Sequence, residues 1–441
     1  MRIAIVGSGI SGLACAWLLS QRHAVTVYEG DARIGGHANT VLVDWRGRSI
    51  PVDVGFLVYN ERNYPNLTRL FAHFDVATQP TDMSFGVSID GGRLEYSGSS
   101  LAGLFAQPRN LFCGSHRRML LDILRFNRDA KRFLEDEHDS EASLGQFLAR
   151  PGYGDAFQRH YLLPMGAAIW SASLSGILDF PAGYFLRFFQ NHGLLSLTGR
   201  PVWRTVRGGA QVYVRKLSES FADRIKLGVP VLAVRRCAGG VGVVDGRGEV
   251  ERFDQVVLTC HADQALAVIE QPTVAERTIL GAFAYQTNRA VLHRDRDLMP
   301  KRRAIWSSWN YLASSAAPTE GKASVTYWLN RLQGIDQECL LLMSLNPCRE
   351  PRAESVIATF RYEHPQYTAA TVAAHARIGE IQGHERLWFC GANWGYGFHE
   401  DGLRSGLEVA AALDVAAPWW PAAAANRFGP ISILRAAARS A

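Results

Sequence analysis

The alternation of apolar and polar residues gives the start of the chain a clear order of elements. A short β-branched run, "RIAIV" at residues 2–6, is typical of a fully buried parallel strand. A glycine-rich turn follows it, then "LACAWLLSQ" with helical spacing, and then a second strand, "AVTVYE", at residues 24–29. This order predicts a βαβ unit at the beginning of the chain.

The middle third has a different character. Residues 64–203 are rich in Phe, Leu, Tyr and Arg at helix-like periods and contain few β-branched runs. Within them, residues 115–137 form an amphipathic helical pattern with arginines on one side. Packing on its own domain is the more ordinary reading of this helix, and its basic face leaves a membrane contact open.

The second half returns to strands. Residues 240–260 predict a hairpin and a buried strand, and residues 264–366 contain alternating apolar strands that suggest a sheet over a substrate cavity. We therefore expect an α/β protein in which two domains are interleaved along 441 residues.

Composition narrows the class of protein only slightly. The chain is 47% hydrophobic and 20% charged, as in soluble globular proteins, and carries a net charge of +6. That charge, mostly from arginine, fits a phosphate-bearing cofactor, an anionic membrane or nucleic acid, but there is no nucleic-acid motif. Seven scattered cysteines without a C-x-x-C pair argue for reduced thiols in a cytosol and against a zinc site. No stretch is apolar for long enough to span a membrane.

The turn after the first strand has the chemistry of a dinucleotide site. Gly7, Gly9 and Gly12 stand in G-x-G-x-x-G order, and Glu29 ends the second strand. The glycines serve a tight turn, close backbone approach to a pyrophosphate and close helix packing, while free N–H groups at Ile10 and Ser11 favour the anion. Glu29 would accept hydrogen bonds from a ribose.

The sequence that follows distinguishes FAD from NAD. The stretch "EGDARIGGHANT" from Glu29 to Thr40 resembles the E-x-x-x-R-x-G-G-R motif of flavin-dependent amine oxidases, phytoene desaturases and protoporphyrinogen oxidases. The resemblance implies non-covalent FAD held by Gly30, Arg33, Gly35, Gly36 and, in place of the family's last arginine, His37. The same resemblance places Asp53, Gly55 and Phe56 beside the flavin and gives the backbone of Val231 to the adenine.

The other end of the chain completes the resemblance. "FCGANWGYGFHEDGLRSG", from Phe389 to Gly406, is similar to the family's final glycine-rich turn and flavin-facing helix. Gly391 would lie at the turn, and Asp401, as N-cap, would open the helix with Gly402 and Leu403. Backbone N–H groups at such a helix start stabilise the negative charge of reduced flavin.

Together these motifs imply a Rossmann-like FAD-binding domain of the glutathione-reductase and amine-oxidase type, interleaved with an α+β substrate domain. We expect the FAD-binding domain to comprise residues 1–63, 204–263 and 375–415, and the substrate domain residues 64–203 and 264–374, with residues 416–441 as a tail. In that tail, Trp419 and Trp420 could either meet a lipid interface or pack on the domain.

The residues above the flavin are expected from spacing within the family. The strand "TNRAVLH" offers Arg289 where amine oxidases carry a lysine, and Phe398 occupies the place of a substrate-framing tyrosine. His399 is a candidate base, or else a hydrogen-bonding spacer in the turn. Arg289 could hold a substrate phosphate or carboxylate, or pair with Asp295 or Asp297. Trp306, Trp309 and Tyr327 are candidate substrate contacts.

The whole chain looks most similar to FAD-binding oxidoreductases associated with cyclopropane-fatty-acyl-phospholipid synthases. The resemblance implies oxidation of a modified acyl chain of a phospholipid, a cytoplasmic location that includes the inner membrane surface, and a methyltransferase partner of that type. The alternatives are an amine or polyamine oxidase, a flavin-binding accessory subunit without turnover, and, more remotely, a non-redox isomerase. A permanently charged Arg289 near an amine would disfavour the first alternative.

Overall fold

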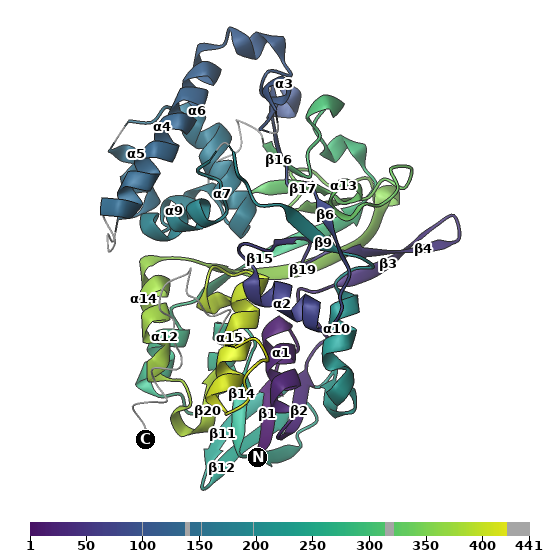
Figure 1. Cartoon of the computed structure of the whole chain (residues 1–441), viewed down its shortest axis with the longest axis vertical. Helices are drawn as coiled ribbons and strands as arrows, with labels where there is room; N and C mark the ends of the chain where they lie inside the picture. Colours follow the sequence, from purple (N-terminus) through teal and green to yellow (C-terminus); the bar gives the residue numbers. More distant parts are fainter. Residues whose placement is uncertain (99, 137–141, 151, 197, 314–321, 421–441) are drawn as a thin grey trace.

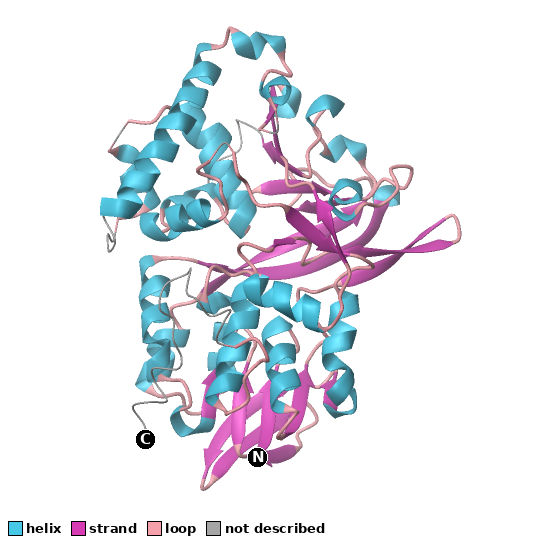
Figure 2. Ribbon diagram, in the orientation of Figure 1, coloured by secondary structure: helices cyan, strands magenta, loops and turns pink. Residues whose placement is uncertain are grey.

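A computed structural model describes residues 1–98, 100–136, 142–150, 152–196, 198–313 and 322–420. Figure 1 shows two units stacked along the long axis of the molecule, with the N-terminus in the lower one. The lower unit is a layered α/β domain, and the upper unit is a sheet covered by helices, as the colouring in Figure 2 makes plain. The predicted fold class is confirmed.

A five-stranded parallel sheet forms the centre of the lower unit. Its strand order is β10-β2-β1-β14-β20, and every neighbouring pair is parallel. In β1, Ile3 and Ile5 belong to one hydrophobic core and Ala4 and Val6 to another, so both faces are covered, as a continuous apolar run requires. The strands are β1 (Arg2–Val6), β2 (Ala24–Glu29), β10 (Ile225–Leu227), β14 (Gln255–Leu258) and β20 (Leu387–Phe389).

Helices α1 (Ile10–Leu19) and α15 (His399–Ala412) pack directly against each other on one face of this sheet. A Cβ on Gly402 would lie 2.9 Å from Ser11 Oγ, and one on Gly406 would lie 2.4 Å from the backbone oxygen of Ser11. The first turns of the two helices therefore touch, and only glycine permits that distance. The remaining elements of this unit are α10 (Gln211–Ser218), β11 (Val231–Cys237), β12 (Gly240–Asp245), β13 (Val250–Phe253), α11 (Ala262–Val268), α12 (Val274–Leu280) and α14 (Ala369–Arg377).

A seven-stranded sheet of order β19-β15-β18-β17-β16-β7-β8 forms the base of the upper unit. Only β16 and β7 pair in parallel. The long strands β15 and β19 cross the molecule just above α1, α2 (Pro65–His73) and α15 (Figure 1). The strands are β7 (Phe85–Ile89), β8 (Leu94–Ser97), β15 (Ala284–His293), β16 (Trp309–Ala313), β17 (Ser324–Trp328), β18 (Leu342–Leu345) and β19 (Val356–Gln366).

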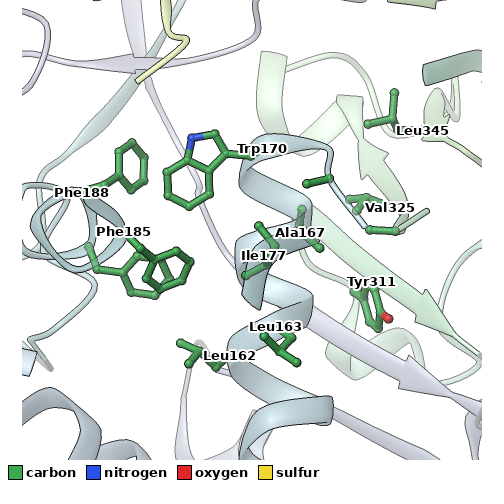
Figure 3. Close-up of a cluster of buried hydrophobic side chains, with 14 of the residues drawn as sticks. Leu162, Leu163, Ala167, Trp170, Ile177, Phe185, Phe188, Tyr311, Val325 and Leu345 are labelled. Atoms are coloured by element: carbon green, nitrogen blue, oxygen red, sulfur yellow. The ribbon is translucent and has the colours of Figure 1, made fainter. Parts of the chain in front are cut away.

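A layer of helices covers one face of the seven-stranded sheet. Figure 3 shows Trp170 of α7 and Phe188 of α9 in a buried cluster that continues to Tyr311 of β16 and Val325 of β17. The helices are α3 (Leu101–Leu104), α4 (Gly114–Asp136), α5 (Leu144–Ala149), α6 (Asp155–Phe157), α7 (Leu163–Trp170), α8 (Leu174–Leu178) and α9 (Ala182–Asn191). The amphipathic pattern predicted for residues 115–137 corresponds to α4.

Short elements connect the two units. They are the hairpin of β3 (Thr40–Trp45) and β4 (Arg48–Asp53), the small sheet of β5 (Tyr59–Asn60), β9 (Trp203–Val206) and β6 (Thr78–Thr81), and α13 (Leu329–Gln333). The strands of the two large sheets fall within the segments expected for each domain, while the exact domain boundaries stay a prediction.

The interface role considered for Trp419 is wrong. Trp419 is buried and stacks on Trp17 of α1, with ring centroids 5.9 Å apart. The rest of the predicted tail, from residue 421, lies outside the described residues. Among the described residues, no helix combines the length and the apolar character needed to cross a bilayer.

Gly406→Ala should destabilise the protein because its methyl group would push into the backbone of α1. We expect a loss of about 1–3 kcal/mol in the free energy of unfolding, measured in urea. Gly183→Ala in α9, where the nearest atom would be 4.0 Å away, is the matched control and should leave stability unchanged or raised. Equal stability of the two variants would contradict the tight contact of α1 and α15.

Candidate functional site

The glycine-rich turn at residues 7–12 leaves space on one side only. Gly7 has φ +108°, and a Cβ on Gly12 would lie 2.1 Å from the backbone oxygen of Gly7. Gly9 differs, because a Cβ there would meet nothing within 4 Å. The turn is therefore tightly packed at Gly12 and open at Gly9. Gly9 directly precedes the free N–H groups of Ile10 and Ser11 at the start of α1. A diphosphate fits this open side.

Glu29 lies at the carboxyl end of β2, next to this turn. Its carboxylate accepts hydrogen bonds from the N–H (2.9 Å) and hydroxyl of Ser8 and from the N–H of Asp31 (2.9 Å). Val229 N–H donates to the Glu29 backbone oxygen at 2.8 Å, which brings the start of β11 at Val231 close to it. Gly30 packs on Pro230. The sequence-predicted ribose and adenine residues are thus assembled at one edge of the sheet.

The loop of residues 33–37 supplies buried donors without partners. Gly35 N–H donates to the Ser8 backbone oxygen at 2.9 Å, and Gly36 packs on Gly9, which places this loop against the glycine-rich turn. Arg33 Nη1 and His37 Nε2 are buried and lack hydrogen-bond partners among the described residues. A buried polar group without a hydrogen-bond partner raises the free energy of the folded protein. The arrangement of these two groups therefore fits a polyanionic ligand that would accept their hydrogen bonds. The site therefore fits the diphosphate of FAD.

Residues 53–56 pack against the same loop. A Cβ on Gly55 would lie 2.1 Å from the His37 backbone oxygen, and Phe56 N–H donates to that oxygen at 2.7 Å. The Asp53 carboxylate accepts from Ala210 N–H (2.8 Å) and Thr40 Oγ1 (2.5 Å), and burial raises its pKa to about 6. Asp53 thus holds the start of α10 in place, and its contact with a cofactor stays a prediction.

Helix α15 begins two residues before the predicted start, at His399. Phe398 is the N-cap, and Asp401 lies in the first turn, where it accepts a hydrogen bond from Phe398 N–H at 3.1 Å. The prediction that Asp401 is the N-cap is therefore wrong, although its carboxylate still satisfies a free N–H. Gly391 N–H donates to Ser405 Oγ at 2.9 Å, and Leu403 is fully buried, so the glycine-rich turn is tied to α15.

Three carboxylates of α15 are buried. Burial raises the pKa of Glu400 to about 7, of Asp401 to about 6 and of Glu408 to about 7. Glu400 accepts hydrogen bonds from the N–H groups of Asn66 and Leu67, both at 3.0 Å, and so caps α2. All three groups are therefore shifted toward their neutral forms.

His399 is held between an aromatic ring and a phenol. It stacks on Phe56 with ring centroids 3.9 Å apart, and its Nε2 lies 2.6 Å from Tyr213 Oη. Burial lowers the pKa of His399 to about 3, so the imidazole is neutral at physiological pH. This geometry agrees with a hydrogen-bonding spacer, and a proton-accepting role stays a prediction.

The expected pairing of Arg289 with Asp295 or Asp297 is wrong, while its contact with a substrate stays a prediction. Its exposed guanidinium forms a bidentate ion pair with Glu350, at 2.6 and 2.8 Å, rather than pairing with Asp295 or Asp297. Because side chains alternate along a strand, its neighbour Asn288 lies on the opposite face of β15 and is fully buried.

Asn288 belongs to a polar cluster that sequence reasoning missed. Its Oδ1 accepts from Gln286 Nε2 (3.1 Å) and Asn346 Nδ2 (2.7 Å), so its Nδ2 must donate to His364 Nδ1 at 2.9 Å. His364 then carries its proton on Nε2 when neutral, and burial lowers its pKa to about 4. Its ring lies 5.5 Å from that of His37. This cluster faces the predicted cofactor site.

A small cavity opens beside the start of α15. Phe398 stacks on Phe188 of α9, with ring centroids 5.1 Å apart. The cavity is lined by Asn63, Tyr64, Phe188, His192, Tyr396, Phe398, Glu400 and Asp401. Phe398 thus lies where a substrate contact was expected.

The other three substrate candidates lie elsewhere. Trp306 packs edge-on against Trp328 in a separate small core cluster. Trp309 and Tyr327 pair edge-on in the core beneath the helical layer. None of the three lines the cavity, so their assignment as substrate residues is not supported by the structure. The described residues also contain no group of side chains that could hold a metal ion.

The parallel sheet, the open glycine-rich turn and the unpaired donors beside it define an FAD-dependent oxidoreductase. Comparison with protein families agrees, because a model of the flavin containing amine oxidoreductases matches residues 10–332. The chain belongs to this family.

Solved structures of several such enzymes have the same fold. A protein from Exiguobacterium sp. 255-15 assigned as a protoporphyrinogen oxidase is 17% identical, with 94% of this chain and 98% of that chain covered and a TM-score of 0.66. Cyclohexylamine oxidase from Brevibacterium oxydans IH-35A is 16% identical (93% and 98% covered, TM-score 0.66). A CLA-producing fatty acid isomerase from P. acnes is 15% identical (92% and 96% covered, TM-score 0.65). No curated protein matched the sequence.

Gly9→Ala tests the cofactor site without disturbing the fold. The backbone at Gly9 is extended, with φ −68°, and the space beside it is open. The apoprotein should keep its unfolding free energy within about 0.5 kcal/mol, while the Kd for FAD should rise at least about tenfold. Gly12→Ala is the contrasting variant and should destabilise the apoprotein itself. Unchanged FAD affinity in Gly9→Ala would place the diphosphate elsewhere.

Glu408→Gln tests the buried carboxylates. The folded pKa of Glu408, about 7, lies above the ordinary 4.5, so this group favours folding below pH 4.5 and loses that contribution as pH rises through 7. The variant should match the wild type at pH 5 and exceed its unfolding free energy by roughly 1–3 kcal/mol at pH 8. Urea unfolding at both pH values measures this difference. A variant that is less stable at pH 8 would mean that the ion pair with Arg404 outweighs burial.

Proposed function

We propose that this enzyme oxidises an apolar substrate, the modified acyl chain of a phospholipid, by removing a hydride from a C–H bond next to a branch or a double bond. The observation that carries the proposal is the aromatic lining of the cavity beside α15, whose two carboxylates already accept hydrogen bonds from backbone N–H groups. Its lining combines aromatic rings with ionisable groups whose pKa values are all shifted toward the neutral form. Such a lining suits a hydrocarbon better than a charged molecule.

The ionisable groups around the cavity have pKa values shifted toward their neutral forms and are engaged by other parts of the protein. Burial lowers the pKa of His192 to about 4, and the neighbouring His399 has a pKa of about 3. Glu400 has a raised pKa and is engaged by α2, and Asp401 is engaged by the Phe398 N–H. A protonated amine would therefore find no free carboxylate among the described lining residues. This argument favours a lipid over an amine.

FAD, when bound, supplies the acceptor for the hydride and its two electrons. The chain's own residues have two further tasks. Phe188 and Phe398 hold the acyl chain, and the neutral imidazole of His399 takes the proton from the adjacent carbon while the remaining electron pair forms the C=C bond. Oxygen or a quinone would then take up the two electrons. Acidity of that adjacent C–H is low, so the hydride must leave first or together with the proton.

Two kinds of likeness support the lipid substrate. One is the resemblance to oxidoreductases associated with cyclopropane-fatty-acyl-phospholipid synthases, which also suggests a methyltransferase as the source of the modified chain. The other is the fold shared with a fatty acid isomerase, which at 15% identity is a likeness of fold alone. An amine oxidase or a non-catalytic accessory subunit would share the same FAD site.

Anaerobic mixing of the FAD-loaded enzyme with candidate substrates tests the proposal. Phospholipids with methyl-branched, cyclopropane or unsaturated chains should bleach the flavin absorbance, while putrescine and cyclohexylamine should not. Bleaching by an amine alone would establish the amine oxidase alternative. Isomerised lipid without net flavin reduction would establish an isomerase. FAD retained with no reduction by any substrate, together with co-purification of a methyltransferase, would establish the accessory subunit.

His399→Gln separates the proton acceptor from the binding residues. Gln keeps a side-chain donor and acceptor but is a far weaker base, so the rate of flavin reduction should fall about 100-fold or more with little change in the apparent Kd for lipid. The spectrum of bound FAD and its Kd, measured in the absence of lipid, should stay close to those of the wild type. An unchanged rate of flavin reduction would show that His399 is not the proton acceptor.

A further inference from the structure

Large apolar side chains are exposed at one end of the helical layer. Three of them come before α4 in the sequence: Leu101, which begins α3, Leu111 and Phe112. Two more, Leu121 and Leu124, lie on α4 itself. Phe112 is 84% exposed and Leu101 is 76% exposed. We call these five residues the apical patch. Figure 1 draws α3 and α4 at the end of the molecule opposite the five-stranded sheet. Contiguous exposed apolar residues of this kind mark an interaction surface.

Positive charge accompanies the apical patch. Residues 101–121 contain Arg109, Arg117 and Arg118 but no Asp or Glu. Arg118 pairs with Asp122 at 3.1 Å, whereas exposed Arg109 and Arg117 have no ion pair among the described residues. The patch therefore combines apolar side chains with guanidinium groups free to meet an anion.

Helix α4 presents this surface in a fixed orientation. Arg117, Leu121, Leu124 and Arg128 follow one another at spacings of four, three and four residues, so they share one face of the helix. On the opposite face, Phe126 is fully buried and contacts Phe189 of α9, with ring centroids 6.5 Å apart. The inner face anchors α4, and the outer face has no partner in the described part of the chain.

The same helices connect the patch with the cavity. Phe189, which contacts α4, is the neighbour of Phe188, which lines the cavity beside α15. A single helix, α9, thus lies between α4 and the proposed site for an acyl chain.

We propose that the apical patch docks the enzyme on an anionic lipid bilayer, with Phe112 and Leu101 inserted at headgroup depth and Arg109 and Arg117 against lipid phosphates. Apolar side chains flanked by basic ones are the pattern of a peripheral, reversible membrane contact. A second copy of the chain is a poorer occupant, because a symmetric contact would bring these arginines together with no carboxylate in residues 101–121 to pair with them. The inference rests on the proposed function in one respect: an acyl substrate resides in a bilayer, and this gives the enzyme a reason to dock there.

Sedimentation of the FAD-loaded full chain with vesicles tests this surface. Wild-type protein should bind vesicles that contain phosphatidylglycerol more tightly than vesicles of phosphatidylcholine alone, and rising salt should reduce the difference. The double variant Leu101→Ser/Phe112→Ser should lower the partition coefficient at least about tenfold on anionic vesicles, because two large apolar contacts are lost. Arg109→Gln/Arg117→Gln should lower binding roughly tenfold on anionic vesicles and leave the weak binding to phosphatidylcholine unchanged.

Matched controls lie away from the apical patch. Leu42→Ser/Val274→Ser removes two apolar side chains that are 65% and 73% exposed but lie outside the patch, and Arg48→Gln/Arg247→Gln removes two exposed arginines there. Both controls should bind vesicles as the wild type does. All variants change exposed side chains, and an unchanged flavin spectrum and thermal midpoint confirm that each one is folded.

Vesicle binding equal to the wild type in both patch variants would overturn the inference, and so would a patch-dependent dimer in sedimentation velocity that does not bind vesicles. Flavin reduction by detergent-solubilised phospholipid distinguishes a failure of the docking surface from a failure of the proposed function. Patch variants should keep that activity while losing activity on vesicles. If no lipid reduces the flavin but the vesicle results hold, the docking surface stands and the substrate assignment fails.

Discussion

The contact between the first turns of α1 and α15 determines the rest of the structure. Gly402 and Gly406 allow α15 to rest on Ser11, so two helix N-termini, 389 positions apart in sequence at Ile10 and His399, lie side by side at one edge of the parallel sheet. Each N-terminus presents free N–H groups and the positive end of a helix dipole. A chain that brings two such ends together needs an anion nearby, and the unpaired Arg33 and His37 add to that need. Binding of a dinucleotide is therefore a consequence of how the two ends of the chain pack.

The same packing explains the charge state of the substrate side. Every residue of α15 from Glu400 to Ala410 is buried, so the carboxylates of this helix are far from bulk water. Glu400 is used to cap α2, and Asp401 satisfies the N–H of Phe398. Backbone N–H groups thus engage both carboxylates at the start of this helix. The packing of α15 therefore raises the pKa values of the carboxyl groups beside the cavity and also provides their hydrogen-bond donors.

The amino-acid sequence predicted the features that depend on the local backbone conformation. It missed the features that depend on strand register or on residues far apart in the sequence. The close approach of Gly7 and Gly12 could be anticipated because both belong to one turn, in which a Cβ on Gly12 would meet the backbone oxygen of Gly7. The ion pair of Arg289 with Glu350 could not be anticipated because the two residues lie 61 positions apart and meet only in the folded protein. Asn288 and His364 meet only through pairing of β15 with β19, 76 residues apart. Trp419 finds its partner in Trp17, at the other end of the chain, which no local pattern indicates.

The two proposals together suggest a role for the helical layer, which lies between the apical patch and the cavity. An acyl chain that left a bilayer through water would expose its methylene groups at a cost of about 0.8 kcal/mol each, so even a short chain makes that route prohibitive. A protein that keeps its cavity one helix away from a bilayer-binding face shortens the exposed path. Phe126, Phe188 and Phe189 already form a continuous apolar connection between α4 and the cavity through α9. An acyl chain that travels along these aromatic side chains meets protein rather than solvent, and this is the arrangement that the two proposals together require.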